Sequence, residues 1–231
     1  VYWNENKDAG KSWERHTIRP TSQQMGTMKN AVADIDGDGD MDFTFIYMND
    51  GKTVWFENAA DTAWIEHEIG TLGAGGIWAT AADVDGDSDL DVIAARYQSG
   101  TIMLFENQLP DSTWKRKTIT TLSGTALGEC VDLDMDGDLD LITHSNAPNK
   151  EALVWFENPS WVSHKITSKV PNLNYGSVGD IDNDGDLDVA YGGVHHIGWC
   201  ENLNNALEWK RHSIHTIVDR YPIPTAVVDI N

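Results

Sequence analysis

Short apolar blocks separated by polar turns recur along the whole chain, and no stretch keeps the 3.6-residue apolar spacing of an amphipathic helix. Each apolar block is followed by an aromatic segment that ends in Glu-Asn. A segment of the form Trp-x-x-His-x-Ile comes next, with Lys in place of His once. The apolar blocks are residues 43–47, 92–95, 141–143 and 189–191, the Glu-Asn segments are 2–6, 54–58, 103–107, 154–158 and 198–202, and the last segments are 13–18, 64–69, 114–119, 161–166 and 209–214. Because Gly, Asn, Asp and Pro separate these blocks, the pattern predicts an all-β chain of short strands.

A nine-residue acidic loop precedes each apolar block, at residues 34–42, 83–91, 132–140 and 180–188. The loops start 49, 49 and 48 residues apart, and a fifth begins at Asp229. A period of about 40–50 residues that holds four short strands is typical of a β-propeller blade. We letter these strands A to D, with the acidic loop between A and B. The repeat predicts a single β-propeller domain over residues 1–231, with four complete blades of four antiparallel strands and partial blade segments at both ends.

The repeats open within a strand C and close within the fifth acidic loop. We therefore expect the sequence to be a fragment of a longer protein. We also expect another chain or domain to contact the incomplete blade, because an exposed strand edge pairs readily with a further strand.

The negative charge of the chain is concentrated in the loops. Net charge is −21, but the four loops hold 20 of the 37 acidic residues, and the other 17 nearly balance the 16 Lys and Arg. No basic stripe is present to neutralise phosphates, which argues against a nucleic-acid partner. No apolar run is long enough to span a membrane. Cys130 and Cys200 lie on strands of different blades, so we expect buried, unpaired thiols.

The loops present oxygen ligands at the spacing of a calcium site. Carboxylates at positions 1, 3 and 5 of a tight loop converge on one point, and the main-chain carbonyl of position 7 joins them. Gly at position 6 allows the positive φ of the turn. The first half matches an EF-hand loop, but the last carboxylate stands at position 9, and position 12 is Phe45, Ala94, Thr143 or Tyr191 instead of Glu. We expect about four Ca²⁺ ions that stabilise the A–B turns.

The arrangement Asp-x-Asp-x-Asp-Gly-x-x-Asp between two strands of a blade resembles the FG-GAP/VCBS repeat family, which includes integrin α-subunit propellers and many bacterial secreted proteins. The resemblance covers essentially the whole chain. It implies an extracellular location and calcium ligands in every loop, with position 7 binding through its carbonyl while its side chain faces solvent. These residues are Asp34, Asp36, Asp38, Asp40 and Asp42, then Asp83, Asp85, Asp87, Asp89 and Asp91, then Asp132, Asp134, Asp136, Asp138 and Asp140, and finally Asp180, Asp182, Asp184, Asp186 and Asp188.

The chain departs from the family pattern in two ways. The Phe-Gly and Gly-Ala-Pro signature is absent, and the Trp-Phe-Glu-Asn strand stands in its place. Ser88 replaces Gly at position 6 of the second loop. Because a non-Gly residue held in the left-handed region costs about 1–2 kcal/mol, we predict that this loop binds calcium most weakly.

Residues that break the repeat are the candidates for ligand binding. The recurring Trp of strand C and the recurring Trp and His of strand D are expected to pack the blades. In a propeller the B–C and D–A connections lie on the face opposite the acidic loops, and we call this the connection face. Its aromatic and basic side chains suit sugars, which stack on rings and bond to Arg, although an ordinary solvated surface is the alternative. They are Trp78, Arg96, Tyr97, His144, Tyr175, His195, His196, Arg220 and Tyr221.

Three functions stay open. The first is a non-catalytic extracellular binding or adhesion module for a carbohydrate or protein ligand, favoured because no catalytic motif is present. The second is a polysaccharide lyase, which needs a base, a cation that neutralises the uronate carboxylate, and an acid. The lyase candidates are His144, His195 or His196 as base, Arg96 or Arg220 as cation, and Tyr97, Tyr175 or Tyr221 as acid. The third is a structural repeat that spaces other domains.

Overall fold

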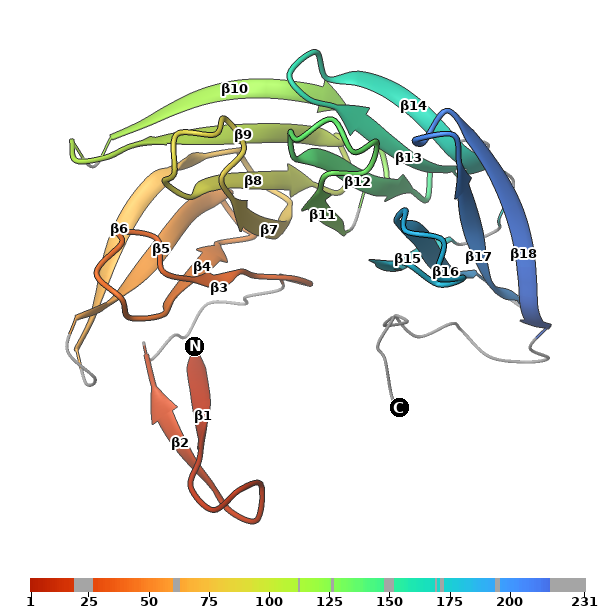
Figure 1. The fold of residues 1–231 in the computed structure, drawn as a ribbon. Coiled ribbons are helices and arrows are strands. Elements are labelled where there is room, and N and C mark those ends of the chain that lie inside the picture. Colours follow the sequence, from red (N-terminus) through yellow and green to blue (C-terminus); the bar gives the residue numbers. More distant parts are fainter. Residues whose placement is uncertain are drawn as a thin grey trace.

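The computed structural model contains four antiparallel sheets of four strands and one two-stranded hairpin (Figure 1). It describes residues 1–18, 27–59, 63–111, 113–125, 127–147, 152–168, 170, 173–193 and 196–216. Strands follow chain order within every sheet, so each four-stranded sheet is one of the predicted blades. In this part of the chain, no helix is long and apolar enough to cross a membrane. The predicted all-β propeller architecture is confirmed.

The strands of each blade correspond to A, B, C and D in order. The hairpin, which supplies a strand C and a strand D, is β1 (Tyr2–Asn6) and β2 (Trp13–Thr17). Blade 1 is β3 (Val32–Ala33), β4 (Asp42–Ile46), β5 (Lys52–Ala59) and β6 (Ala63–Thr71), and blade 2 is β7 (Gly76–Ala82), β8 (Asp91–Arg96), β9 (Thr101–Gln108) and β10 (Thr113–Thr121). Blade 3 is β11 (Gly128–Val131), β12 (Asp140–Ser145), β13 (Ala152–Glu157) and β14 (Val162–Ser168), and blade 4 is β15 (Asn174–Gly179), β16 (Asp188–Gly193), β17 (His196–Leu203) and β18 (Glu208–Thr216).

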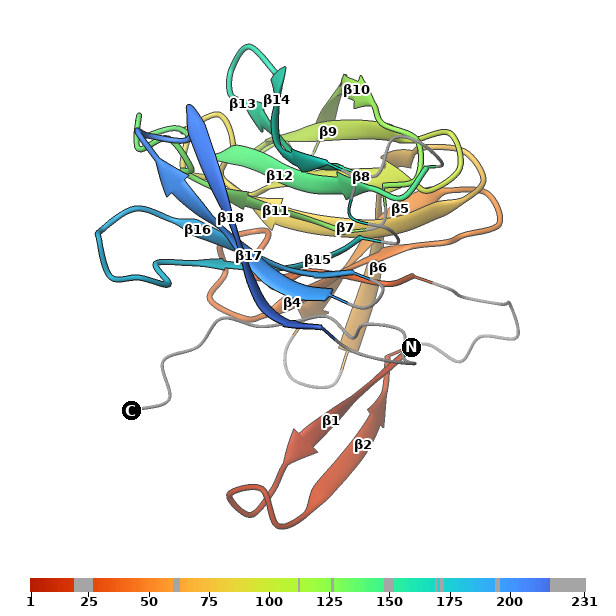
Figure 2. The same cartoon turned by 90° about the vertical axis from the view of Figure 1, so that its right-hand side faces the viewer.

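The four blades stand side by side in an arc, with their A strands on the inside and their D strands on the outside (Figure 1). The hairpin β1–β2 lies next to blade 1, and the view turned by 90° shows it projecting away from the stacked blades (Figure 2). Val1 and Ile18, at its base, pack against Phe45, Val54 and Phe56 of blade 1. The hairpin thus occupies the place of a preceding blade.

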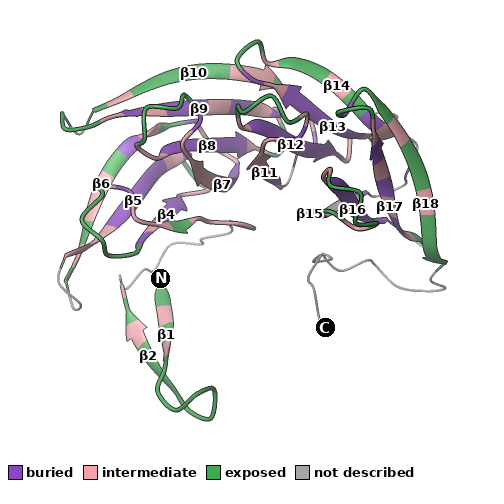
Figure 3. Cartoon of the chain, in the orientation of Figure 1, coloured by how far each residue is buried: buried purple, intermediate pink, exposed green. Residues whose placement is uncertain are grey.

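Apolar cores form between successive blades. The B and C strands are mostly buried and the D strands largely exposed (Figure 3). Between blades 1 and 2, for example, Trp55 and Ile69 pack in one cluster with Phe105. Equivalent clusters join blades 2 and 3, and blades 3 and 4. Burial of each large apolar side chain contributes about 1.5–3 kcal/mol, so contact between neighbouring blades holds the arc together.

A stack of Trp on His recurs at the outer edge of the blades. Trp55 in β5 lies opposite His67 in β6, and their rings stack with centroids 4.5 Å apart. His67 Nε2 also lies 2.6 Å from a carboxylate oxygen of Glu57. The same stack joins Trp3 with His16, Trp155 with His164, and Trp199 with His212. These contacts confirm the prediction for the Trp of strand C and the His of strand D, but Trp13 in strand D of the hairpin is 59% exposed.

Two residues that we expected on the connection face are fully buried inside strands. Trp78 is fully buried in β7, between blades 2 and 3. A Cβ on Gly128 would lie 2.6 Å from its ring, so the missing side chain there makes room for the indole. His144 is fully buried in β12. Both strands extend further toward the connection face than the turn residues indicated, and side chains that point at the next blade are covered. The two cysteines are free, as predicted, but only Cys200 is buried, and Cys130 is partly exposed.

Candidate functional site

The acidic loops connect strands A and B in all four blades, as predicted. Their last Asp, at position 9, is buried and closes the turn. Asp42 accepts the backbone N–H of Ile35 on Oδ2 and that of Asn58 on Oδ1, both at 2.9 Å. The same two bonds form at Asp91, Asp140 and Asp188. Position 9 therefore ties each acidic loop to the Asn that ends strand C, which explains why Glu-Asn recurs.

The side chain of that Asn reaches the neighbouring blade. Asn158 donates its amide to the carbonyl of Val84 at 2.7 Å, so blade 3 bonds to the acidic loop of blade 2. Asn107 and Asn202 make the corresponding bonds to the loops of blades 1 and 3. The acidic loops are thus part of the joints between blades.

Positions 1, 3 and 5 curl each loop around its carboxylates. In the first loop, Asp34 Oδ2 accepts the N–H of Gly39 at 3.0 Å, and Asp36 and Asp38 each accept an N–H two residues further on. Such Asx turns hold the backbone in a tight loop. As a result, three carboxylates in every loop offer oxygens within 4.8 Å of one another. These sets are Asp34, Asp36 and Asp42, then Asp83, Asp85 and Asp91, then Asp132, Asp134 and Asp136, and finally Asp180, Asp182 and Asp188.

The clusters fit a bound cation. Asp34 Oδ1 and Asp132 Oδ1 are buried and accept no hydrogen bond, although a buried polar atom is costly without a partner. Burial, followed by neighbouring carboxylates and opposed by one backbone hydrogen bond, raises the pKa of Asp36 and Asp134. The atoms that each loop cluster offers are carboxylate oxygens, which suit a hard divalent cation such as Ca²⁺. The residues present could therefore hold an ion in each loop.

Burial also raises the pKa of the position-9 carboxylates. Burial raises the pKa of Asp91 to about 7 and of Asp140 to about 6, although two backbone N–H groups bond to each and oppose the shift. Both side chains are essentially inaccessible to water. A cation beside them would favour the ionised form.

The turn needs left-handed residues at two positions. Position 6 has φ values of 97°, 78°, 102° and 103°, so Ser88 is strained there as predicted. The sequence analysis missed position 4, where Gly37, Gly86, Met135 and Asn183 have φ values of 76°, 77°, 66° and 64°. Asn tolerates this region but Met does not, so the third loop carries strain of its own. Gly at position 4 of the first two loops was the sequence feature that could have predicted the positive φ there.

The side chain at position 7 was expected to face solvent. Asp40 and Asp138 do so. The expectation is wrong for Asp89 and Asp186, whose Oδ1 atoms are buried without a hydrogen-bond partner. Asp89 Oδ2 accepts the N–H of Leu109 at 3.2 Å, because the C–D connection of blade 2 folds back over the loop.

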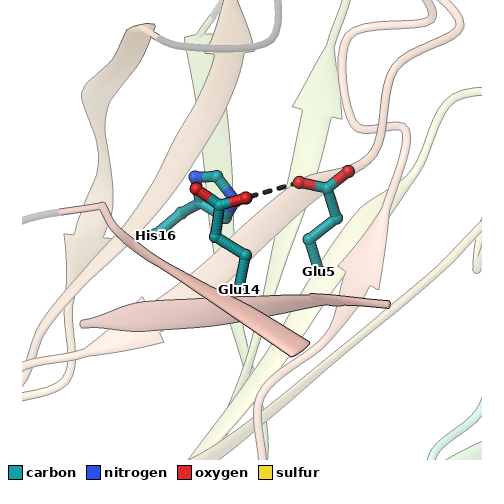
Figure 4. A group of neighbouring side chains, drawn as sticks. All are labelled: Glu5, Glu14 and His16. Atoms are coloured by element: carbon teal, nitrogen blue, oxygen red, sulfur yellow. Dashed lines mark hydrogen bonds and ion pairs between the residues drawn. The ribbon is translucent and has the colours of Figure 1, made fainter. Parts of the chain in front are cut away.

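A second cluster, which the sequence analysis missed, lies on the hairpin. Glu5, Glu14 and His16 offer ligand atoms within 4.8 Å of one another (Figure 4). Glu5 and Glu14 are cross-strand partners, and this pairing was the missed signal. Lys7 Nζ lies 2.7 Å from Glu5 and 3.5 Å from Glu14. Because Lys7 pairs with both carboxylates and His16 lies 3.0 Å from Glu5, the cluster forms an ion-pair network.

The connection face does not gather its predicted residues at one point. Arg96 and Tyr97 lie at the end of β8, where Arg96 Nε donates to the carbonyl of Ala74 at 2.9 Å and Tyr97 is exposed. His196 is exposed at the start of β17, two blades away. His195, Arg220, Tyr221 and the side chain of Tyr175 lie outside the described residues.

Comparison with known proteins settles the repeat type. Residues 34–94 and 83–143 each match the model of an FG-GAP-like repeat. Residues 34–143 therefore carry FG-GAP-like repeats. Each match starts at position 1 of one acidic loop and ends just beyond the next loop, so the matched unit is the blade-to-blade period described above. No curated protein matches the sequence significantly.

The FG-GAP-like chain also resembles solved structures in fold. One is a lectin of Agrocybe aegerita that recognises non-reducing terminal N-acetylglucosamine, with a TM-score of 0.56 and 15% sequence identity. That match covers 80% of this chain and 51% of the lectin, so this chain spans about half of the lectin's length. The other is a protein from Lactobacillus plantarum, with a TM-score of 0.45 and 10% identity over 94% of this chain and 77% of that one.

Proposed function

We propose that this chain is an extracellular, calcium-stabilised β-propeller that acts as a binding or adhesion module for a carbohydrate or protein ligand. The observation that carries the calcium part is the carboxylate cluster of each loop, with the buried and unpartnered oxygens of Asp34 and Asp132. Loops of this kind suit the millimolar calcium found outside cells. Calcium then stabilises the blades, because the same loops bond to the next blade through Asn158 and its counterparts.

The binding part is supported by exposed side chains that break the repeat on the connection face, such as Tyr97 and His196. Aromatic and hydrogen-bonding groups on a rigid β scaffold suit sugar recognition. The Agrocybe aegerita lectin uses a similar fold to recognise a terminal sugar, and we extend carbohydrate binding to this chain as part of the proposal.

The lyase hypothesis has weaker support. The ring of His144 has no exposed surface through which a polysaccharide could reach it, and neither ring nitrogen has a partner that would orient it as a base. Arg96 donates to the carbonyl of Ala74, in the connection between blades 1 and 2, and lies two blades from His196. We therefore expect no rise in ultraviolet absorbance from unsaturated uronates when acidic polysaccharides are incubated with the protein and Ca²⁺.

Calorimetric titration of Ca²⁺ into calcium-stripped protein tests the metal part. We expect about four ions per chain, one for each complete loop. Asp36→Asn should remove one ion, since it withdraws a carboxylate from the first cluster. Asp111→Asn, at an exposed turn outside the loops, is the matched control and should leave the stoichiometry unchanged. Absence of calcium binding, or equal stoichiometry in Asp36→Asn, would sink this part.

Glycan-array binding in the presence of Ca²⁺ tests the ligand part. We expect selective retention on one class of glycan, lost when calcium is stripped. Retention on no glycan and on no extracellular-matrix protein would instead support the purely structural role.

A further inference from the structure

A hollow of about 250 Å³ opens against blade 4, outside the acidic loops. It is lined by Tyr191 of β16, His196 of β17, Arg211 and Ser213 of β18, and Val170 from the connection between blades 3 and 4. One of these residues, His196, belongs to the connection face.

A glycine in strand β17 lets Tyr191, one of the lining residues, lie close to the backbone. Gly198 in β17 pairs with Tyr191 on one side and with Ser213 on the other. Val54, Met103 and Val154 occupy the same register position in blades 1 to 3. A Cβ on Gly198 would lie 2.7 Å from the hydroxyl of Tyr191, so the phenol fills part of the room that a side chain takes elsewhere. Within the described residues, this hydroxyl makes no hydrogen bond.

Among the described residues, the polar groups around the hollow can all donate hydrogen bonds, and none of them is acidic. Arg211 is exposed and forms no ion pair with any described residue, although the chain has a net charge of −21. His196, Ser213 and the Tyr191 hydroxyl add three uncharged or weakly basic hydrogen-bonding groups. A guanidinium binds a carboxylate through two parallel hydrogen bonds. The chemistry of the lining therefore selects a carboxylate.

We propose that this hollow binds the carboxylate of one acidic sugar residue, a uronate, with Arg211 as its cation. The volume is below the roughly 300–1,000 Å³ of drug-sized pockets, which suits a single sugar ring better than a longer segment. Val170 supplies an apolar contact for a ring face. The inference rests on the proposed binding function, for which it names the ligand class.

The test is a protein-detected NMR titration of the calcium-loaded chain with galacturonate and glucuronate, compared with galactose, glucose and acetate. We expect saturable shifts with a uronate, and binding at least about tenfold weaker for the neutral sugars and for acetate. Arg211→Gln should weaken uronate binding at least about tenfold. Ser213→Glu should abolish binding, because the new side chain would repel the carboxylate of the sugar. Glu is compatible with this exposed site, since blade 1 has Glu68 at the same register position.

Arg116→Gln is the matched control. Arg116 lies opposite Phe105 as Arg211 lies opposite Cys200, it is equally exposed, and Met103 fills the space beside it. We expect uronate affinity to stay unchanged in this variant, and melting curves should show that all three variants fold. Equal weakening by Arg116→Gln, or unchanged affinity in Arg211→Gln, would overturn the assignment.

Two further outcomes separate this inference from the proposed function. Binding of acetate as tight as that of uronate would overturn the sugar part of the inference. Binding of a neutral glycan elsewhere on the chain, with no uronate response, would overturn the inference and leave the binding module standing.

Discussion

Asn202 in β17 donates its side-chain amide to the main-chain carbonyl of Leu133, 69 residues earlier in the acidic loop of blade 3, at 3.2 Å. Its Oδ1 accepts the N–H of Ala206, and its own backbone N–H bonds to Asp188. One buried residue thus joins strand C and the acidic loop of its own blade to the loop of the blade before it.

Asn202→Ala should lower the free energy of unfolding by about 2–4 kcal/mol, because it leaves the Leu133 carbonyl and the Ala206 N–H buried without partners. Urea denaturation measures the change. Asn58→Ala is the matched control, since within the described residues Asn58 makes no side-chain bond to a preceding loop and its Oδ1 has no partner. Equal losses in both variants would contradict a role in joining blades.

Met135→Asn should raise the free energy of unfolding by about 1 kcal/mol, because Met135 is held at φ 66° and Asn tolerates the left-handed region. The fourth loop already has Asn183 at this position. Met41→Asn controls for the exchange itself, since Met41 is as exposed as Met135 (59% against 57%) and lies in the first loop at a negative φ. Thermal melting of both variants, with and without Ca²⁺, makes the comparison, and a gain in Met41→Asn of the same size would refute the strain argument.

Removal of calcium should lower the melting temperature, because the folded loops bind the ion and the unfolded chain does not. When the free calcium concentration is about 100-fold above the dissociation constant of a site, that site contributes about 2.7 kcal/mol to the free energy of unfolding. Magnesium at the same concentration should restore less of the loss, since it demands a smaller octahedral site. Identical melting temperatures in calcium and in chelator would rule out structural calcium.

In calcium-stripped protein, the contribution of Asp91 to stability should fall as the pH rises from about 5 to about 8. The folded pKa of Asp91 is raised from 3.8 to about 7. Between these two values the folded state keeps a proton that the unfolded chain has lost, so the free energy of unfolding decreases with rising pH. Asp140 contributes in the same direction up to about pH 6. Urea denaturation across this range tests the sign.

Asp91→Asn is the control for this pH dependence, because it removes the titrating group and should flatten the slope above about pH 6. With calcium bound, protons compete with the ion, and we expect stability to rise with pH over the same range. A calcium-free slope of the same sign as the calcium-bound one would show that burial of Asp91 does not control it.

Much of the architecture could be predicted from the sequence, because a propeller repeats the same residue types at the same positions in every blade. The spacing of the acidic loops, the alternation of polar and apolar residues around Trp55, and the turn residues each depend on the residues of a single blade. Boundaries were harder to place. Trp78 was assigned to a connection because Gly75-Gly76 looks like a turn, but β7 begins at Gly76 and the ring is covered by blade 3.

The blade, its period, the oxygen-rich loops and the left-handed position 6 could all be predicted from the sequence, since each depends on residues close together in the chain. The contacts and the hollow between blades became evident only from the folded structure. The bond from Asn202 to Leu133 joins residues 69 positions apart, and the hollow beside Arg211 is lined by side chains from three strands and from a connection between blades. Such features depend on the packing of one sheet against the next, and the spacing of residues along a single blade carries no information about it.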